Sequence, residues 1–111
     1  MSEHFLYLET RGRTTGEPRT IEIWFVEHEG RFYMVSEHRE ASGWVKNLMK
    51  DASVRFSVGT REDRSAGRPL GRARARIVRP EEDAALVREV SARMDQKYGW
   101  SDGTVVEVSP A

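Results

Sequence analysis

The chain has 111 residues, of which 38% are hydrophobic and 32% are charged, and its 18 basic and 18 acidic side chains give a formal net charge of zero. This length suits one domain with a single hydrophobic core. The even balance argues against a general nucleic-acid binder, which needs excess positive charge to displace counterions. The absence of cysteine excludes disulfides, thiolate metal sites and a cysteine nucleophile.

Other function classes lack their sequence signals. No apolar run of about 18 residues and no basic-then-apolar leader occurs, so the sequence predicts a cytoplasmic protein without a membrane span. His4, His28 and His38 lie far apart and form no H-E-x-x-H pattern, so no metal site is expected. The motifs G-x-S-x-G and Walker A are absent, which leaves hydrolase and nucleotide-phosphatase readings unsupported.

In the first half of the chain, apolar segments alternate with turns that contain glycine and proline, which predicts strands joined in hairpins. Ile21 and Ile23 alternate with Glu22, and the apolar run Trp24–Val26 then suggests a strand end covered on both faces. Apolar residues within 43–50 recur at helical spacing. The predicted elements are strand His4–Thr10, turn Arg11–Arg19, strand Thr20–Glu27, a hairpin turn at Glu29-Gly30, strand Arg31–Ser36, loop Glu37–Ala41, and helix Gly43–Lys50 after a Ser42 cap.

In the second half, one predicted strand carries an unusual charge pattern. Ala73 and Ala75 alternate with Arg72, Arg74 and Arg76, so small residues occupy one face and arginines the other. These arginines either extend an anion site or form a solvated or salt-bridged face, for example against the acidic start of the last helix. The predicted elements are strand Ser53–Thr60, loop Arg61–Pro69, strand Leu70–Arg79, a helix that Pro80 opens and Gly99 ends, and strand Thr104–Val108.

The predicted order is strand-strand-strand-helix-strand-strand-helix-strand. Strands dominate and the early ones are joined by short turns, so the sheet should be largely antiparallel. We therefore expect a mainly β protein with two helices (α+β), folded as a six-stranded antiparallel barrel in a single domain over residues 1–111.

The turn Arg11–Arg19 is the sharpest functional signal. It is longer than a hairpin needs and carries three arginines, two glycines and two threonines. Glycines let backbone N–H groups approach an anion, and arginines and hydroxyls supply further donors. The turn is therefore either a clamp for a phosphate or carboxylate, or a solvated hairpin loop whose charges keep the edge soluble.

Three segments resemble a known family. T-x-G-R-x-T-G-x-P-R after the first strand, Trp44–Leu48 as W-x-x-N-L, and Val54–Gly59 as V-x-V-x-x-G are similar to motifs of the deazaflavin (coenzyme F-420)-dependent nitroreductase family. That family lies within the flavin-binding split β-barrel superfamily, which includes pyridoxamine-phosphate oxidases. The resemblance covers about Phe5 to Val78 and implies a split β-barrel.

The resemblance also implies a cofactor site. Its ring system would lie near the side chains of Ser36, Trp44 and Asn47, with no side chain acting as a covalent catalyst, because the deazaflavin (coenzyme F-420) or FMN carries the hydride. Read from the residues alone, Trp44 is a core residue and Asn47 a partner of a neighbouring loop. By the resemblance, the phosphate-bearing tail would be bound by Arg13, Thr14, Thr15, Gly16 and Arg19.

The sequence departs from the family at the ring end. Glu37–Gly43 is short and charged where the family has a Gly-Gly pair and a His-Pro, and no matched motif supports a substrate role for Tyr98 or Trp100. Three functions stay open: an oxidoreductase that reduces a quinone, a nitro compound or another small molecule; a carrier or sensor that binds a flavin-like cofactor without turnover; and an interaction domain that keeps only the fold. The resemblance also favours a homodimer.

Overall fold

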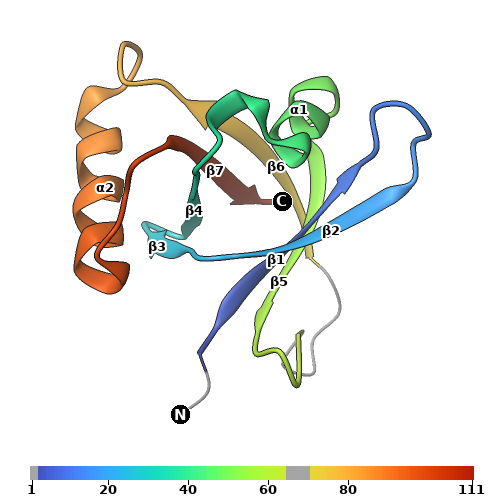
Figure 1. Ribbon diagram of the computed structural model, residues 1–111, viewed down its shortest axis with the longest axis horizontal. Helices are drawn as coiled ribbons and strands as arrows, with labels where there is room; N and C mark the ends of the chain where they lie inside the picture. The colour runs from blue at the N-terminus through green and yellow to red at the C-terminus, as the bar shows by residue number, and fades with distance from the viewer. Residues whose placement is uncertain (1–2, 65–70) are drawn as a thin grey trace.

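The computed structural model describes residues 3–64 and 71–111. Seven antiparallel strands form one sheet in the order β2-β1-β5-β6-β7-β4-β3, with two α-helices and a short 3-10 helix outside it (Figure 1). The elements are β1 (Phe5–Arg11), β2 (Pro18–Ile23), β3 (Val26–His28), β4 (Arg31–Ser36), η1 (Arg39–Ala41), α1 (Gly43–Lys50), β5 (Ser53–Gly59), β6 (Gly71–Val78), α2 (Ala84–Tyr98) and β7 (Thr104–Pro110).

The sheet has seven strands and not the six expected, because the predicted strand Thr20–Glu27 is broken in two. β2 pairs with β1 and β3 pairs with β4, so the two halves lie at opposite edges of the sheet. Only Trp24 and Phe25 separate them along the chain. The sheet therefore curls until its two edges are joined by one short link, which gives a barrel-like fold.

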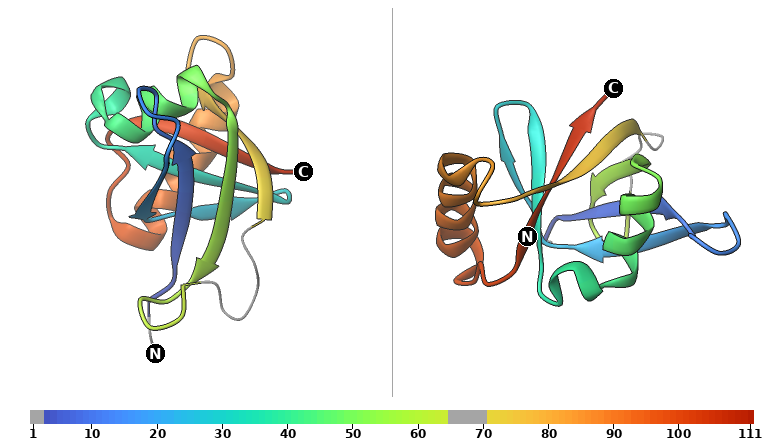
Figure 2. Two further views of the ribbon diagram at one scale, coloured as in Figure 1. Left: turned by 90° about the vertical axis from the view of Figure 1, so that its right-hand side faces the viewer. Right: turned by 90° about the horizontal axis from the view of Figure 1, so that it is seen from above.

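Two apolar clusters lie on the two faces of this curled sheet. The inner cluster takes alternate residues of the strands, such as Leu6, Leu8 and Val106, and α1 covers it with Val45 and Leu48. The outer cluster packs α2 against the other face of β4, β6 and β7. The two helices consequently lie on opposite sides of the molecule (Figure 2).

The helix ends explain two differences from expectation. α2 begins at Ala84 and not at Pro80, because the Asp83 side chain accepts a hydrogen bond from the Leu86 amide at 3.1 Å and caps the helix there. Gly99 ends α2 in the left-handed conformation, as predicted. Ser42 precedes α1 as expected, but its side chain makes no capping hydrogen bond.

Most other strand and helix predictions are confirmed within a residue or two, whereas the expected loop Glu37–Ala41 contains the 3-10 helix Arg39–Ala41, and residues 65–69 of the expected loop Arg61–Pro69 lie outside the described residues. Strand Arg31–Ser36 and helix Gly43–Lys50 match the predicted bounds, and Glu29-Gly30 forms the hairpin turn with both residues at positive φ. The expected strand Leu70–Arg79 is observed as Gly71–Val78, and Leu70 lies outside the described residues. Among the described residues, no helix is long and apolar enough to cross a bilayer.

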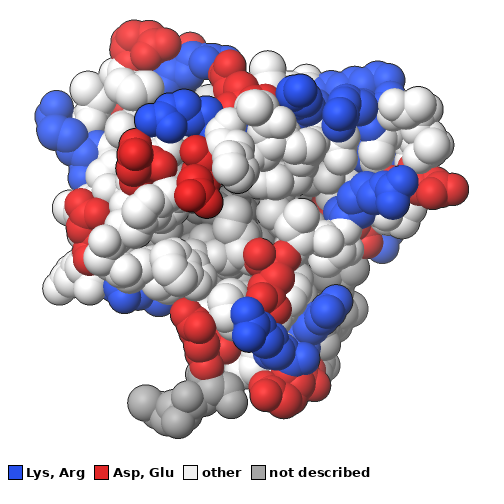
Figure 3. All heavy atoms as spheres, in the orientation of Figure 1, with Lys and Arg blue, Asp and Glu red and all other residues white. Residues whose placement is uncertain are grey.

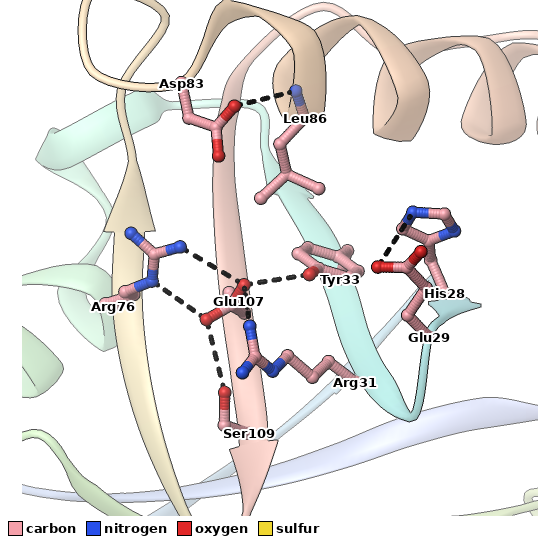
Figure 4. A network of polar contacts seen from close by, with 9 residues as sticks. All are labelled: His28, Glu29, Arg31, Tyr33, Arg76, Asp83, Leu86, Glu107 and Ser109. Atoms are coloured by element: carbon pink, nitrogen blue, oxygen red, sulfur yellow. Dashed lines mark hydrogen bonds and ion pairs between the residues drawn. The ribbon is translucent and has the colours of Figure 1, made fainter.

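A buried carboxylate ties three strands together on the outer face. Glu107 of β7 accepts hydrogen bonds from Arg76 of β6 at 2.8 Å and from the Tyr33 hydroxyl of β4 at 2.8 Å (Figure 4). Burial alone would raise the pKa of Glu107, but the hydrogen bonds from Arg76 and Tyr33 outweigh it and the pKa is lowered. Burial and the bond to Glu107 raise the pKa of Tyr33 to about 12.

Replacing Glu107 with glutamine should lower the free energy of unfolding by about 1–3 kcal/mol, because the neutral amide no longer pairs with Arg76. A carboxyl group whose pKa is lowered in the folded state stabilises the fold at pH values above its ordinary pKa of 4.5. This stabilisation is lost as the pH falls and the carboxylate becomes protonated. Urea unfolding should therefore show the largest difference between wild type and Glu107→Gln at neutral pH, and a shrinking one below pH 4.5.

Glu82→Gln, which changes an exposed glutamate before α2, is the matched control and should show little difference at any pH. A destabilisation by Glu107→Gln of the same size at neutral and acidic pH would contradict this account of the ion pair.

Candidate functional site

A cavity of about 630 Å³ opens where the β2–β3 link, the end of β4, the start of α1 and the segment after α2 meet. These segments surround the middle of the view in Figure 1, where the space-filling view shows the surface hollowed (Figure 3). The volume lies in the range of small-molecule sites. We call it the aromatic cavity; it is lined by Phe5, Glu22, Ile23, Trp24, Val35, Ser36, Glu37, His38, Ser42, Trp44, Arg61 and Trp100.

Aromatic rings form much of the cavity wall. All three tryptophans of the chain, Trp24, Trp44 and Trp100, line it together with Phe5, although they come from four separate segments. Large flat apolar surfaces of this kind favour stacking with a planar ligand. Among the tryptophans, the sequence predicted a ring-system role for Trp44 alone. Trp24, which belongs to the run Trp24–Val26 expected to be covered on both faces, is 38% exposed.

The position of Trp24 is fixed by the end of α2. Its ring stacks on Tyr98 with centroids 4.4 Å apart and planes within 3°. The Tyr98 hydroxyl accepts from the Phe25 amide at 3.1 Å and donates to the Phe25 carbonyl at 3.0 Å, and Lys97 also donates to that carbonyl. The backbone groups of Phe25, which lie between two strands, are thereby satisfied. Tyr98 therefore holds both the strand break and the tryptophan beside it.

One edge of the cavity carries an ion pair. Glu22 accepts from Arg61 at 3.1 Å and from the hydroxyl of the buried Tyr7 at 2.9 Å. The hydrogen bond from Arg61 is the largest cause that lowers the pKa of Glu22, whereas burial raises the pKa of Tyr7. The edge thus presents a carboxylate held ionised and a guanidinium. Sequence reasoning missed Glu22 and Arg61, since they are 39 residues apart and belong to no motif.

The segment after β4 forms another edge. The Ser36 hydroxyl donates to the Arg39 carbonyl at 2.8 Å and lies 2.8 Å from the Ser42 hydroxyl, which holds the segment in a tight arch. Glu37 and His38 line the cavity from this arch. The charged stretch that departs from the family pattern in sequence therefore lies at the cavity itself.

The glycine-rich turn docks on α1. Asn47 is the anchor: its Oδ1 accepts from the Arg13 amide at 3.2 Å and from the Arg13 guanidinium at 2.9 Å, and its Nδ2 donates to Thr10 at 3.2 Å. Arg13 also donates to the Gly43 carbonyl at 3.3 Å, at the start of the helix. Gly16 closes the turn at a φ of 75°, which an L side chain rarely adopts.

A second hollow of about 430 Å³ lies between this turn and the C-terminal end of α1. We call it the turn hollow. Most of its lining is cationic or carries backbone amides and hydroxyls, as an anion site requires. It is lined by Arg11, Gly12, Arg13, Thr14, Thr15, Gly16, Lys50 and Asp51.

The structure thus divides the residues singled out in the sequence into two groups. Ser36 and Trp44 line the aromatic cavity, whereas Arg13, Thr14, Thr15 and Gly16 line the turn hollow. Asn47 lines neither and holds the turn through its hydrogen bonds with Arg13. Arg19 is exposed on β2, directly opposite Thr10, and lines neither of the two. Trp44 near the start of α1 lines the aromatic cavity and Lys50 at its end lines the turn hollow, and the eight-residue helix is about 12 Å long at about 1.5 Å per residue.

Replacing Asn47 with alanine should loosen the turn, because the Arg13 amide and guanidinium lose their common acceptor. We expect the amides of Gly12, Arg13 and Gly16 to exchange hydrogen faster, with a loss of about 1–2 kcal/mol in stability. Hydrogen exchange followed by NMR measures this, with Lys46→Ala, an exposed position on the same helix, as the control. Unchanged exchange in Asn47→Ala would show that the turn holds itself without the helix.

Comparison with solved structures identifies the fold. The heme storage protein HutZ from Vibrio cholerae matches with a TM-score of 0.73 at 20% identity, over 96% of this chain and 81% of that chain. An FAD-binding protein from Mesorhizobium loti matches with a TM-score of 0.70 at 10% identity, over 98% and 82% of the two chains. A structure described as an F420 reductase matches with a TM-score of 0.61 at 15% identity, over 96% and 86%. At these identities the similarities show that the chain shares the fold of these proteins.

The family assignment comes from the sequence. No curated protein matches the chain. The model of the F420H(2)-dependent quinone reductase family matches residues 1–104, which is nearly the whole chain. The deazaflavin-type cofactor expected from the sequence is the one for which this family is named. The chain belongs to the F420H(2)-dependent quinone reductase family.

Proposed function

We propose that the protein is an oxidoreductase that uses a reduced deazaflavin to reduce a quinone or a similar unsaturated small molecule. The observation that carries the proposal is the pair of hollows at the two ends of α1, one walled by aromatic rings and the other by cationic and amide groups. A cofactor with a planar ring and a phosphate-bearing tail needs both kinds of surface, and the eight-residue helix α1, about 12 Å long, extends from one to the other.

The residues present fit such a cofactor. Trp24, Trp44 and Trp100 would enclose the ring system and exclude water from it, while Ser36 holds the arch beside them. The tail would bind the turn through Arg13, Thr14, Thr15 and the Gly16 backbone, with Lys50 from the helix. For Arg19, which lies apart from both hollows, a contact with the tail stays a prediction.

When bound, the reduced deazaflavin supplies the hydride. The chain's own residues supply position and electrostatics. Glu22 and Arg61 place opposite charges side by side at the cavity edge. These charges would orient a polar substrate that accepts the hydride. Because Glu22 is held ionised, it accepts hydrogen bonds and does not serve as a proton donor at neutral pH. No covalent step on a side chain is required.

FMN is the alternative cofactor, and a carrier without turnover is the alternative function. The position of Glu37 and His38 at the cavity favours the carrier, because a carboxylate and an imidazole line it in the stretch where the family pattern has a Gly-Gly pair and a His-Pro. That the protein forms a homodimer, and that it is located in the cytoplasm, also stay predictions.

Titration of the purified protein with the deazaflavin and with FMN, followed by calorimetry, tests the binding step. We expect the deazaflavin to bind, and Arg13→Ala to weaken it by about tenfold or more, the effect of losing a charge-assisted hydrogen bond. Trp44→Leu should also weaken binding of the deazaflavin, because it removes an aromatic surface from the site proposed for the ring system. Arg88→Gln, an exposed arginine on α2, is the charge-matched control. The proposal is wrong if neither cofactor binds at saturating concentration, or if both site variants bind like wild type.

A second experiment separates the reductase from the carrier. The complex with reduced deazaflavin is mixed with a soluble quinone, and the absorbance of the oxidised cofactor is followed. If the absorbance of the oxidised cofactor grows faster with the protein than with the free reduced cofactor and the same quinone, the result supports the reductase. Tight binding with no acceleration for quinone or nitro acceptors would establish the carrier.

A further inference from the structure

The outer face of β1, β5 and β6 carries a second concentration of positive charge. Neighbouring strands bring their outward residues into register: Arg55 of β5 lies directly opposite Arg72 of β6, and Ser53 lies opposite Arg74. On the other side of β5, Arg55 faces Glu9 of β1. A hollow of about 390 Å³ lies on this face, lined by Glu9, Arg11, Ser53, Val54, Arg55, Arg72, Ala73, Arg74 and Ala111. We call it the arginine hollow.

These arginines differ from the six that form ion pairs on the surface. Six arginines of the described chain have a carboxylate within 4.0 Å: Arg31, Arg39, Arg61, Arg76, Arg79 and Arg93. In the same described part of the chain, none of the four arginines of the hollow has such a partner. The arginine stripe predicted on β6 is accordingly divided: Arg76 pairs with Glu107, whereas Arg72 and Arg74 face the hollow.

This arrangement is unfavourable for the protein on its own. Like charges directly opposite on adjacent strands repel, and Arg55 and Arg72 form such a pair. Glu9 is the one carboxylate side chain among the described residues that line the hollow, against four guanidinium groups. The charge is therefore concentrated locally although the chain as a whole is neutral.

We propose that the arginine hollow binds the linked phosphate groups of a small polyphosphate-bearing ligand. Guanidinium groups bind phosphate oxygens through two parallel hydrogen bonds. The four guanidinium groups come from three neighbouring strands, which are spaced about 4.8 Å apart. They therefore cover a distance greater than the width of one phosphate group and suited to two or three linked phosphates. Short side chains, Ser53 and Ala73, leave room between them.

The shape and lining of the hollow favour a small ligand over nucleic acid. No aromatic side chain is among its lining residues in the described chain, so bases would have nothing on which to stack. The hollow is also distinct from the aromatic cavity, with which it shares no lining residue, and it meets the turn hollow only at Arg11. The proposal therefore does not depend on the proposed reductase function.

Calorimetric titration with inorganic pyrophosphate and tripolyphosphate, at constant ionic strength, tests the proposal. We expect one saturable site that binds both more tightly than sulfate. Arg72→Gln and Arg74→Gln should each weaken binding by about tenfold, and Glu9→Gln should strengthen it. Arg88→Gln on α2 should change nothing, although it removes the same charge.

Thermal unfolding gives an independent readout. Without ligand, Arg72→Gln should raise the Tm because it relieves the repulsion from Arg55. Pyrophosphate should raise the Tm of wild type and have less effect on this variant. Absence of saturable pyrophosphate binding, or equal weakening by Arg88→Gln, overturns the proposal.

Two further outcomes would also overturn it in favour of another ligand. Tighter binding of a single-stranded oligonucleotide than of tripolyphosphate would identify a nucleic-acid surface. Weaker deazaflavin binding in Arg72→Gln and Arg74→Gln, with no pyrophosphate site, would assign the hollow to the cofactor tail.

Discussion

The break between β2 and β3 is the constraint on which the rest of the structure depends. One apolar run supplies both edges of the sheet, so the chain must turn between them at Trp24 and Phe25. The backbone groups of Phe25 lose sheet partners at that point, and the Tyr98 hydroxyl replaces both of them. The same side chain stacks on Trp24. Closure of the barrel and the position of Trp24 in the cavity wall therefore have one cause, the docking of the α2 C-terminus on the link.

Much of the fold follows from local sequence. Alternation at Val54, Phe56 and Val58 and the Glu29-Gly30 turn predicted elements that are observed, because side-chain period and positive φ are local properties. The break at Trp24–Phe25 was missed, because its stabilising partner lies 73 residues away. The start of α2 was misplaced because Pro80 and Asp83 both fit helix starts, and only the Asp83 side chain makes the capping bond.

Contacts around the candidate site were foreshadowed in the sequence where the residues belong to recognisable motifs. The turn around Arg13 and its anchor Asn47 belong to motifs, and the structure joins them by hydrogen bonds. Glu22, Arg61 and Phe5 carry no such signal, since the curl of the sheet alone brings them to one cavity. The arginines of β6 show the same limit: their alternation predicted a charged face, but only the cross-strand register distinguishes Arg76, paired with Glu107, from Arg72, opposite Arg55.

The central claim is that the aromatic cavity receives the cofactor's ring system. All three tryptophans of the chain line this cavity, so their indole N–H signals in an NMR spectrum report on it without background from elsewhere. On titration with the deazaflavin, the account predicts large shifts of all three signals, as expected for nuclei beside an aromatic ring. Binding of the deazaflavin that leaves the signals of Trp24, Trp44 and Trp100 unchanged would contradict it.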